Sequence, residues 1–151
     1  LRIGIASDHA GVDLKNLVIE YLKMTDHTVT DLGTESSEKS VDYPDYASAL
    51  AKQVSDKTLD RGIAICGTGI GMCITCGKFP GVRAVSVWDS FSAKMSRAHN
   101  DSNIMCIGSR SLNHHRAIDL VKTWLATPFE GARHALRVNK IREIEKQNFR
   151  I

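Results

Sequence analysis

The chain lacks the apolar run of about 20 residues that a membrane-spanning helix needs. It also carries little net charge, +3 over 151 residues, which argues against nucleic acid or a membrane surface as its main partner. No secretory signal is visible in its opening residues, and four cysteines in a chain of this size do not indicate a secreted disulfide scaffold. We therefore expect a cytoplasmic protein.

No internal repeat, low-complexity tract or linker-like segment divides the chain. Its length suits one core, and its composition of 42% hydrophobic and 25% charged residues is ordinary for a folded domain. Residues 1–151 are accordingly expected to form a single domain.

Short β-rich apolar segments alternate along the chain with longer segments of helical periodicity. Strands are expected at 2–6, 28–32, 62–66, 82–88 and 103–107, and helices at 12–24, 43–54, 72–78, 90–99, 112–126 and 133–147. This alternation predicts an α/β fold of parallel βαβ units, with an open sheet covered on both faces.

The segment Cys66-Gly67-Thr68-Gly69-Ile70-Gly71 follows the third expected strand. Glycines at alternate positions allow a tight turn whose backbone N–H groups face one point, which suits a phosphate or a developing oxyanion. A cysteine at the start of a helix is favoured as the thiolate by the helix dipole. These features fit a proton-abstracting base beside an oxyanion hole, and they fit equally a structural glycine turn under a buried thiol.

A nucleotide-binding loop is the alternative from another class, because Asp89 stands about 20 residues after the glycines, as in dinucleotide-binding folds. However, the glycines form G-x-G-x-G and not G-x-G-x-x-G, and no G-x-x-x-x-G-K-[ST] loop occurs. The chain also leaves no room for a second, substrate-binding domain. A phosphate- or nucleotide-binding module without catalysis remains the competing hypothesis.

Polar residues follow two other expected strands. Asp8 and His9 follow the first strand, and Arg110 follows the fifth. Because ligands bind beyond the carboxyl ends of parallel strands, these residues and the glycine loop are expected at one edge of the sheet.

Two groups later in the chain are further candidates. His99 ends a helix, where it serves either as a partner of the helix dipole or as an acid–base that opens a sugar ring. Arg133 and Arg137 share one helix face and suit a phosphate dianion, or form a solvated basic face. The Cys73-x-x-Cys76 motif has no second ligand pair at zinc spacing, so we interpret it as core packing.

Taken together, these segments resemble the type B ribose-5-phosphate isomerase family, which includes galactose-6-phosphate and allose-6-phosphate isomerases. The resemblance rests on Ser7–Gly11, Asp42–Ala47, Cys66–Met72, His99–Asn103, Gly108–Arg110, Arg133-His134 and Arg137-Val138. They occur in the family's order over essentially the whole chain.

This resemblance implies a Rossmann-like three-layer α/β/α sandwich with a five-stranded parallel sheet. It also implies a homodimer or tetramer with its active site at the dimer interface, in which the C-terminal helix, about 131–147, packs on the partner subunit. The implied ligand is a small sugar phosphate, with no cofactor, metal, nucleic acid or membrane.

The resemblance further implies roles for single residues. Cys66 would move a proton between C2 and C1 through an enediolate, with Thr68 hydrogen-bonded nearby. His99 from the partner subunit would open the furanose ring, with Asp8 close by. The backbone of Gly67, Gly69, Ile70 and Gly71, with Asn100 from the partner subunit, would hold the enediolate oxygen, and His9, Arg110, Arg133 and Arg137 would hold the phosphate.

The implied reaction is the interconversion of D-ribose 5-phosphate and D-ribulose 5-phosphate, in the non-oxidative branch of the pentose phosphate pathway. A six-carbon aldose 6-phosphate, of allose or galactose, is the alternative substrate. Cys66 matches the branch of the family that uses cysteine as the base. The chain departs from the family pattern at Gly77, at Leu136 and at Ala132, where a second glycine is common.

Overall fold

The computed structural model describes residues 1–149. Its strands are β1 (Arg2–Ser7), β2 (Thr28–Asp31), β3 (Arg61–Cys66), β4 (Ala84–Ser86) and β5 (Ile104–Gly108). Its helices are η1 (His9–Gly11), α1 (Val12–Lys23), α2 (Tyr43–Ser55), α3 (Ile70–Cys76), α4 (Ser90–Ala98), α5 (His114–Ala126) and α6 (Ala132–Phe149). Every strand and helix expected from the sequence is confirmed, with modest shifts at the ends.

The strand β4 is shorter than the expected segment 82–88. The Val82 N–H group closes a turn onto the Phe79 carbonyl (3.2 Å), and the Arg83 N–H group donates to Asn103 Oδ1 (2.7 Å). These contacts occupy the N–H groups that a longer ladder would use, so regular pairing begins only at Ala84.

All five strands are parallel, in the order β2-β1-β3-β5-β4. The chain passes from β1 outward to β2 and then returns to the other side of β1 as β3, so the direction of winding reverses between β1 and β3. The crevice at such a switch point is where open parallel sheets bind ligands. Asp8 follows β1 and Cys66 ends β3, which brings both residues to this edge.

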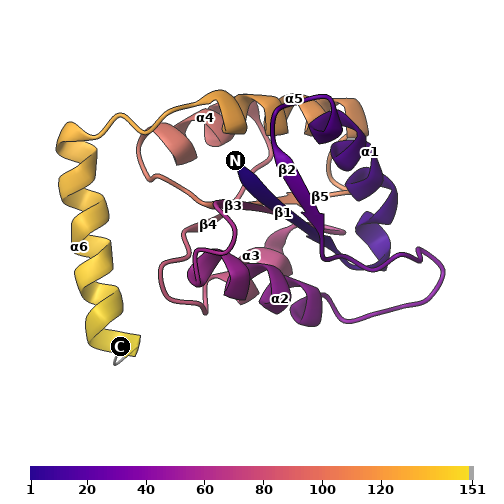
Figure 1. The fold of residues 1–151 in the computed structure, drawn as a ribbon, viewed down its shortest axis with the longest axis horizontal. Coiled ribbons are helices and arrows are strands. Elements are labelled where there is room, and N and C mark those ends of the chain that lie inside the picture. Colours follow the sequence, from indigo (N-terminus) through magenta and orange to yellow (C-terminus); the bar gives the residue numbers. More distant parts are fainter. Residues whose placement is uncertain (150–151) are drawn as a thin grey trace.

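Two helical layers cover the sheet, with α1, α4 and α5 on one face and α2 and α3 on the other (Figure 1). The α1 side carries large strand residues: Ile3, Ile5, Ile63, Ile65, Met105 and Ile107. The α2 side carries mostly small ones: Gly4, Ala6, Gly62, Ala64, Cys66 and Cys106. Small side chains let α2 and α3 approach closely, and a Cβ atom added to Gly4 would lie 2.6 Å from Leu50 Cδ1. The expected three-layer α/β/α sandwich is confirmed.

The helix α6 stands apart from both layers (Figure 1). Over the described part of the helix only His134 and Val138 are buried. A turn with positive φ at Gly131 (67°) and Ala132 (46°) starts the helix, and its apolar residues Leu136, Ile141, Ile144 and Phe149 are exposed. No helix within residues 1–149 combines the length and the hydropathy needed to cross a bilayer.

Candidate active site

Cys66 lies where β3 turns into the glycine loop, and its side chain is only 5% exposed. Its Sγ accepts a hydrogen bond from the Gly69 N–H group at 3.1 Å. Gly69 adopts φ 79°, and a Cβ atom there would lie 2.9–3.1 Å from the Ile107 backbone. The loop therefore needs glycine at this position in order to turn an N–H group toward the sulfur, where it stabilises negative charge.

A cavity of about 410 Å³ opens beside Cys66. Its lining residues are Asp8, Tyr43, Cys66, Gly67, Thr68, Ile70, Gly71 and Ile74. Asp8 is 6% exposed, and its Oδ1 accepts the Ala10 N–H group (3.0 Å) as the N-cap of η1. One cavity thus brings the carboxylate after β1 together with the thiol and loop after β3, as the sequence predicts.

Thr68 is exposed at the rim of this cavity, and its Oγ1 accepts the Ile70 N–H group at 3.2 Å. Two N–H groups for which the family resemblance implies contact with an enediolate oxygen thus donate within the loop, Gly69 to the sulfur and Ile70 to Thr68. The Thr68 hydroxyl supports the loop backbone in this way at the start of α3.

Arg110 and His9 flank the loop region. The Arg110 N–H group donates to the Gly67 carbonyl (3.0 Å), and a Cβ atom added to Gly67 would lie 3.4 Å from Arg110 Nη1. This contact places a guanidinium over the loop. His9 Nδ1 accepts the Val41 N–H group (3.2 Å), which joins η1 to the segment before α2.

The remaining candidates lie elsewhere on the chain. His99 and Asn100 follow α4, and Arg133 and Arg137 lie in the first turns of α6. A separate open face of α6 carries Arg133, Leu136, Arg137, Asn139, Lys140, Glu143 and Ile144. It shares no residue with the Cys66 cavity. The expected site residues of one chain therefore form two separate sets. The first lies at the Cys66 cavity, and the second lies at the end of α4 and in α6.

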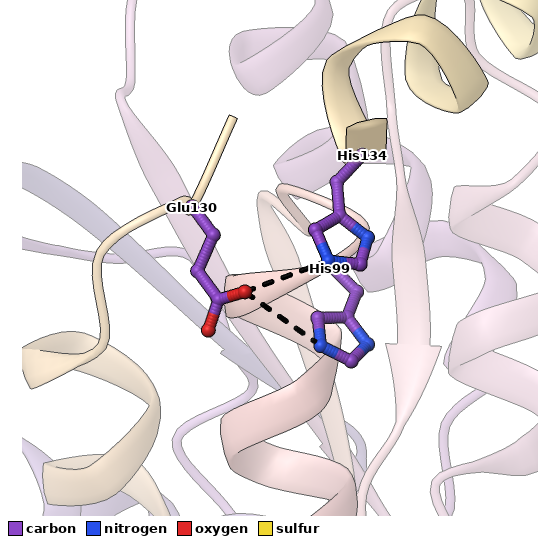
Figure 2. A group of neighbouring side chains, drawn as sticks. All are labelled: His99, Glu130 and His134. Atoms are coloured by element: carbon purple, nitrogen blue, oxygen red, sulfur yellow. Dashed lines mark ion pairs between the residues drawn. The ribbon is translucent and has the colours of Figure 1, made fainter. Parts of the chain in front are cut away.

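The second set includes an arrangement that the sequence did not reveal (Figure 2). The imidazole rings of His99 and His134 stack with centroids 4.0 Å apart and planes 9° from parallel. Glu130 Oε2 lies 3.5 Å from His134 Nε2 and 3.9 Å from His99 Nε2. Burial, then the charges of His99 and Arg133, lower the pKa of His134, and Glu130 only partly offsets them.

Sequence reasoning did not place Tyr43, Glu130 or His134 in the site. Tyr43 begins α2, and its ring fills the space beside Gly71, where an added Cβ atom would lie 2.5 Å from Tyr43 Cζ. The sequence feature that could have identified Tyr43 is its position at a helix start after Asp42, near the sheet edge where the loops meet. Glu130 lies in a short irregular segment and has no local pattern that could have identified it.

The Cys73-x-x-Cys76 motif packs in the layer between the sheet and α2, which confirms the core interpretation. Cys76 and Cys106 are buried, Cys73 is half-buried, and all four cysteines are free thiols. Hydrogen bonds from Cys106 and Ser86 lower the pKa of Cys73 to about 6, against the effect of burial. The same contact with Cys73, together with Cys76 and burial, raises the pKa of Cys106.

The chain is thus an α/β domain with a five-stranded parallel sheet. The glycine loop that follows Cys66 lies at the switch point between β1 and β3, where such folds bind ligands. The Ribose/Galactose Isomerase family model matches residues 3–141, and the chain belongs to that family. Ribose-5-phosphate isomerase B of Escherichia coli is 42% identical over 146 residues, 97% of each chain.

Solved structures agree with this assignment. Ribose-5-phosphate isomerase B of Clostridium thermocellum is similar with a TM-score of 0.94 and 48% identity, over 97% of this chain and 99% of that one. The Mycoplasma genitalium enzyme, solved with bound ribulose-5-phosphate, has a TM-score of 0.94 and 39% identity over 97% of both chains.

Proposed function

We propose that this chain interconverts D-ribose 5-phosphate and D-ribulose 5-phosphate, with Cys66 as the base. The observation that carries the proposal is the Cys66 sulfur at the wall of the 410 Å³ cavity, where it accepts the Gly69 N–H group beside the carboxylate of Asp8. Its support is membership of a family in which a relative of the same fold was solved with ribulose-5-phosphate bound.

In this mechanism the Cys66 thiolate removes the C2 proton from the open-chain aldehyde. The C–H electrons form the C1–C2 double bond of an enediolate, and O1 gains the charge. Cys66 then returns the proton to C1, while the O2 hydroxyl proton moves to O1 and leaves a ketone at C2. The backbone N–H groups of Gly67 and Gly71, and Asn100 of the partner subunit, would stabilise the charged oxygen.

We also propose that two copies of the chain share each site, in a homodimer or tetramer in the cytoplasm. The support is the separation of the Cys66 cavity from His99, Arg133 and Arg137, which leaves the first without a ring-opening group. The helix α6 also exposes Leu136, Ile141 and Ile144, which packing on the partner subunit would bury. His9 and Arg110 would then meet the two α6 arginines around one phosphate.

A six-carbon aldose 6-phosphate is the second candidate substrate, because the matching family model is described for both ribose and galactose isomerases. The catalytic steps at C1 and C2 would be the same. Only the distance from the loop to the phosphate-binding residues would change.

The test is conversion of ribose 5-phosphate by the wild-type chain and by Cys66→Ala, with EDTA present throughout. We expect activity in the wild-type chain and a loss of roughly 10²–10⁴-fold in Cys66→Ala. Substrate affinity should be retained, since the thiolate acts mainly in the transition state. Activity only on allose or galactose 6-phosphate would support the six-carbon alternative. No isomerisation of any of these sugars, with binding of ATP or NADH, would favour the non-catalytic module.

A further inference from the structure

Glu130 is anchored next to His99 by its backbone. Its N–H group donates to the carbonyl of Ala98 (3.0 Å), the residue directly before His99. The left-handed turn at Gly131 and Ala132 then returns the chain, so that His134, whose N–H group donates to the Gly131 carbonyl (2.9 Å), covers the His99 ring. Figure 2 shows the Glu130 carboxylate facing both rings.

Three such groups within 4.8 Å of one another resemble a cation site. The ring geometry argues against this. A metal ion lies in the plane of each imidazole that binds it, about 2.1 Å from the nitrogen. Two nearly parallel planes with centroids 4.0 Å apart offer no such shared position. The cluster is instead arranged to hold a proton.

The charges around the cluster indicate which ring presents an N–H group to Glu130. Burial, His99, Arg133 and Arg137 all lower the pKa of His134, so His134 remains neutral near pH 7. Arg133 Nε–H can donate to His134 Nε2 (3.5 Å), which is an acceptor in that neutral form. The Glu130 carboxylate then faces Nε2 of His99 (3.9 Å), which favours the neutral tautomer with its proton on Nε2 and leaves Nδ1 as the acceptor.

We propose that Glu130 is a positioning residue for His99: its carboxylate, 3.9 Å from Nε2, favours the ring tautomer protonated at Nε2, so that Nδ1 is the atom that exchanges a proton with the sugar. The inference rests on the ring-opening role of His99 in the proposed function. It gives His99 the same carboxylate-oriented imidazole that serves other proton-transferring sites, with neutral His134 as the platform on which the ring stacks.

The proton balance of the step is simple because C1 of a furanose carries both O1 and O4. Nδ1 of His99 takes the O1 proton, and the O1–H electrons form the C1=O1 bond as the C1–O4 bond breaks. The imidazolium, paired with Glu130, then gives its proton to O4, which becomes the C4 hydroxyl. No other reactant is needed.

Ring opening can be measured without isomerisation in the Cys66→Ala chain. Opening and reclosing interconvert the α and β anomers of ribose 5-phosphate, and exchange NMR on sugar labelled with ¹³C at C1 gives that rate. We expect Cys66→Ala to accelerate the interconversion above its spontaneous rate, and His99→Asn added to it to remove the acceleration. Glu130→Gln added to Cys66→Ala should reduce the acceleration roughly tenfold, and Glu130→Asp should reduce it less.

The matched control is Glu20→Gln, an exposed glutamate of α1, which should change nothing. Affinity for ribulose 5-phosphate, which has no free hydroxyl to form a furanose, should stay within about twofold in every variant. Full acceleration in Glu130→Gln with loss in His99→Asn would overturn the role of Glu130 alone, as would a parallel loss of ribulose 5-phosphate affinity. No acceleration by Cys66→Ala, or none lost in His99→Asn, would overturn the role of His99 and this inference together.

Discussion

Cys66 and Cys73 lie on the same side of the sheet, yet their sulfur atoms have different surroundings. Cys66 receives one backbone N–H group and borders the cavity. Cys73 is turned toward Cys106 and Ser86, whose hydrogen bonds bring its pKa to about 6. The thiol whose pKa is lowered to about 6 is therefore Cys73, a packing residue and not the proposed base.

Cys73 should react with iodoacetamide as a thiolate at neutral pH. In the Cys66→Ala chain, alkylation of Cys73 followed by mass spectrometry should be half-maximal near pH 6 and level at higher pH. A rate that still climbs through about pH 8–9, the range of an unperturbed thiol, would contradict this. Because the folded pKa lies below the ordinary value of 9.0, the contribution of Cys73 to the free energy of unfolding is present above pH 9 and is lost as the pH falls from about 9 to about 6.

Arg137 should act on binding more than on chemistry. Arg137→Ala removes one proposed phosphate ligand, so KM for ribose 5-phosphate should rise roughly 10- to 100-fold while kcat changes little. Lys146→Ala is the matched control, since Lys146 lies on the same helix but pairs with Glu143. An unchanged KM in Arg137→Ala would remove this residue from the phosphate site.

Local sequence could identify Cys66 and its glycines because the loop is one continuous segment with its own chemistry. It could not identify Glu130, whose function depends on the Ala98 carbonyl and on a ring at position 99, more than thirty residues away. Tyr43 was missed for a similar reason. Its importance comes from Gly71, which leaves room for the ring.

At the scale of elements, the alternation of side chains in the strands explains most of what could be predicted. Large residues on one face and small ones on the other set the two helical layers and their spacing from the sheet. The N-terminal end of β4 could not be predicted, because the N–H groups of Val82 and Arg83 are taken by a turn onto Phe79 and by the Asn103 side chain. The hydrophobic periodicity of the sequence does not reveal that other acceptors compete for the N–H groups of a strand.

At the start of α6, the backbone conformation determines which residue is favoured. Ala132 has φ 46°, in the region that disfavours any residue with a Cβ atom. The family resemblance implies a glycine at this position. The strain accompanies the turn that brings Glu130 and His134 to His99, so it lies at a proposed functional element.

Ala132→Gly should raise the free energy of unfolding by about 1 kcal/mol, because glycine accepts a positive φ without a steric cost. Urea denaturation at one protein concentration measures this. Ala135→Gly, in the interior of the same helix, should instead lower it by about 1 kcal/mol. Equal destabilisation by both substitutions would show that the turn carries no strain.

At the scale of the whole molecule, the separation of the two residue sets has a direct test. Cys66→Ala and His99→Asn damage opposite halves of a shared site, so each alone should be inactive. After the two are mixed and subunits exchanged, half of the dimers are hybrids, and each hybrid holds one site with both native residues.

Mixed equally, the two variants should recover about a quarter of the wild-type activity on ribose 5-phosphate. Labelling one variant with ¹⁵N and separating the three dimers by native mass spectrometry shows whether subunits have exchanged. Exchange without recovered activity would place Cys66 and His99 in the same chain's site. A fully active monomer on dilution would exclude the shared site altogether.

The position of α6 outside the two helical layers bears on how such enzymes select the length of their substrates. Its 18 residues form a rod about 27 Å long that follows one short turn and contacts the body through the buried His134 and Val138, and through Glu145 Oε1, which accepts the Gly81 N–H group (2.8 Å). If Cys66 contacts one end of the sugar and α6 of a neighbouring copy binds the other, the distance between the two protomers sets the length of the substrate. Tilting the rod would then adapt the enzyme to a chain one carbon longer while the glycine loop stays unchanged.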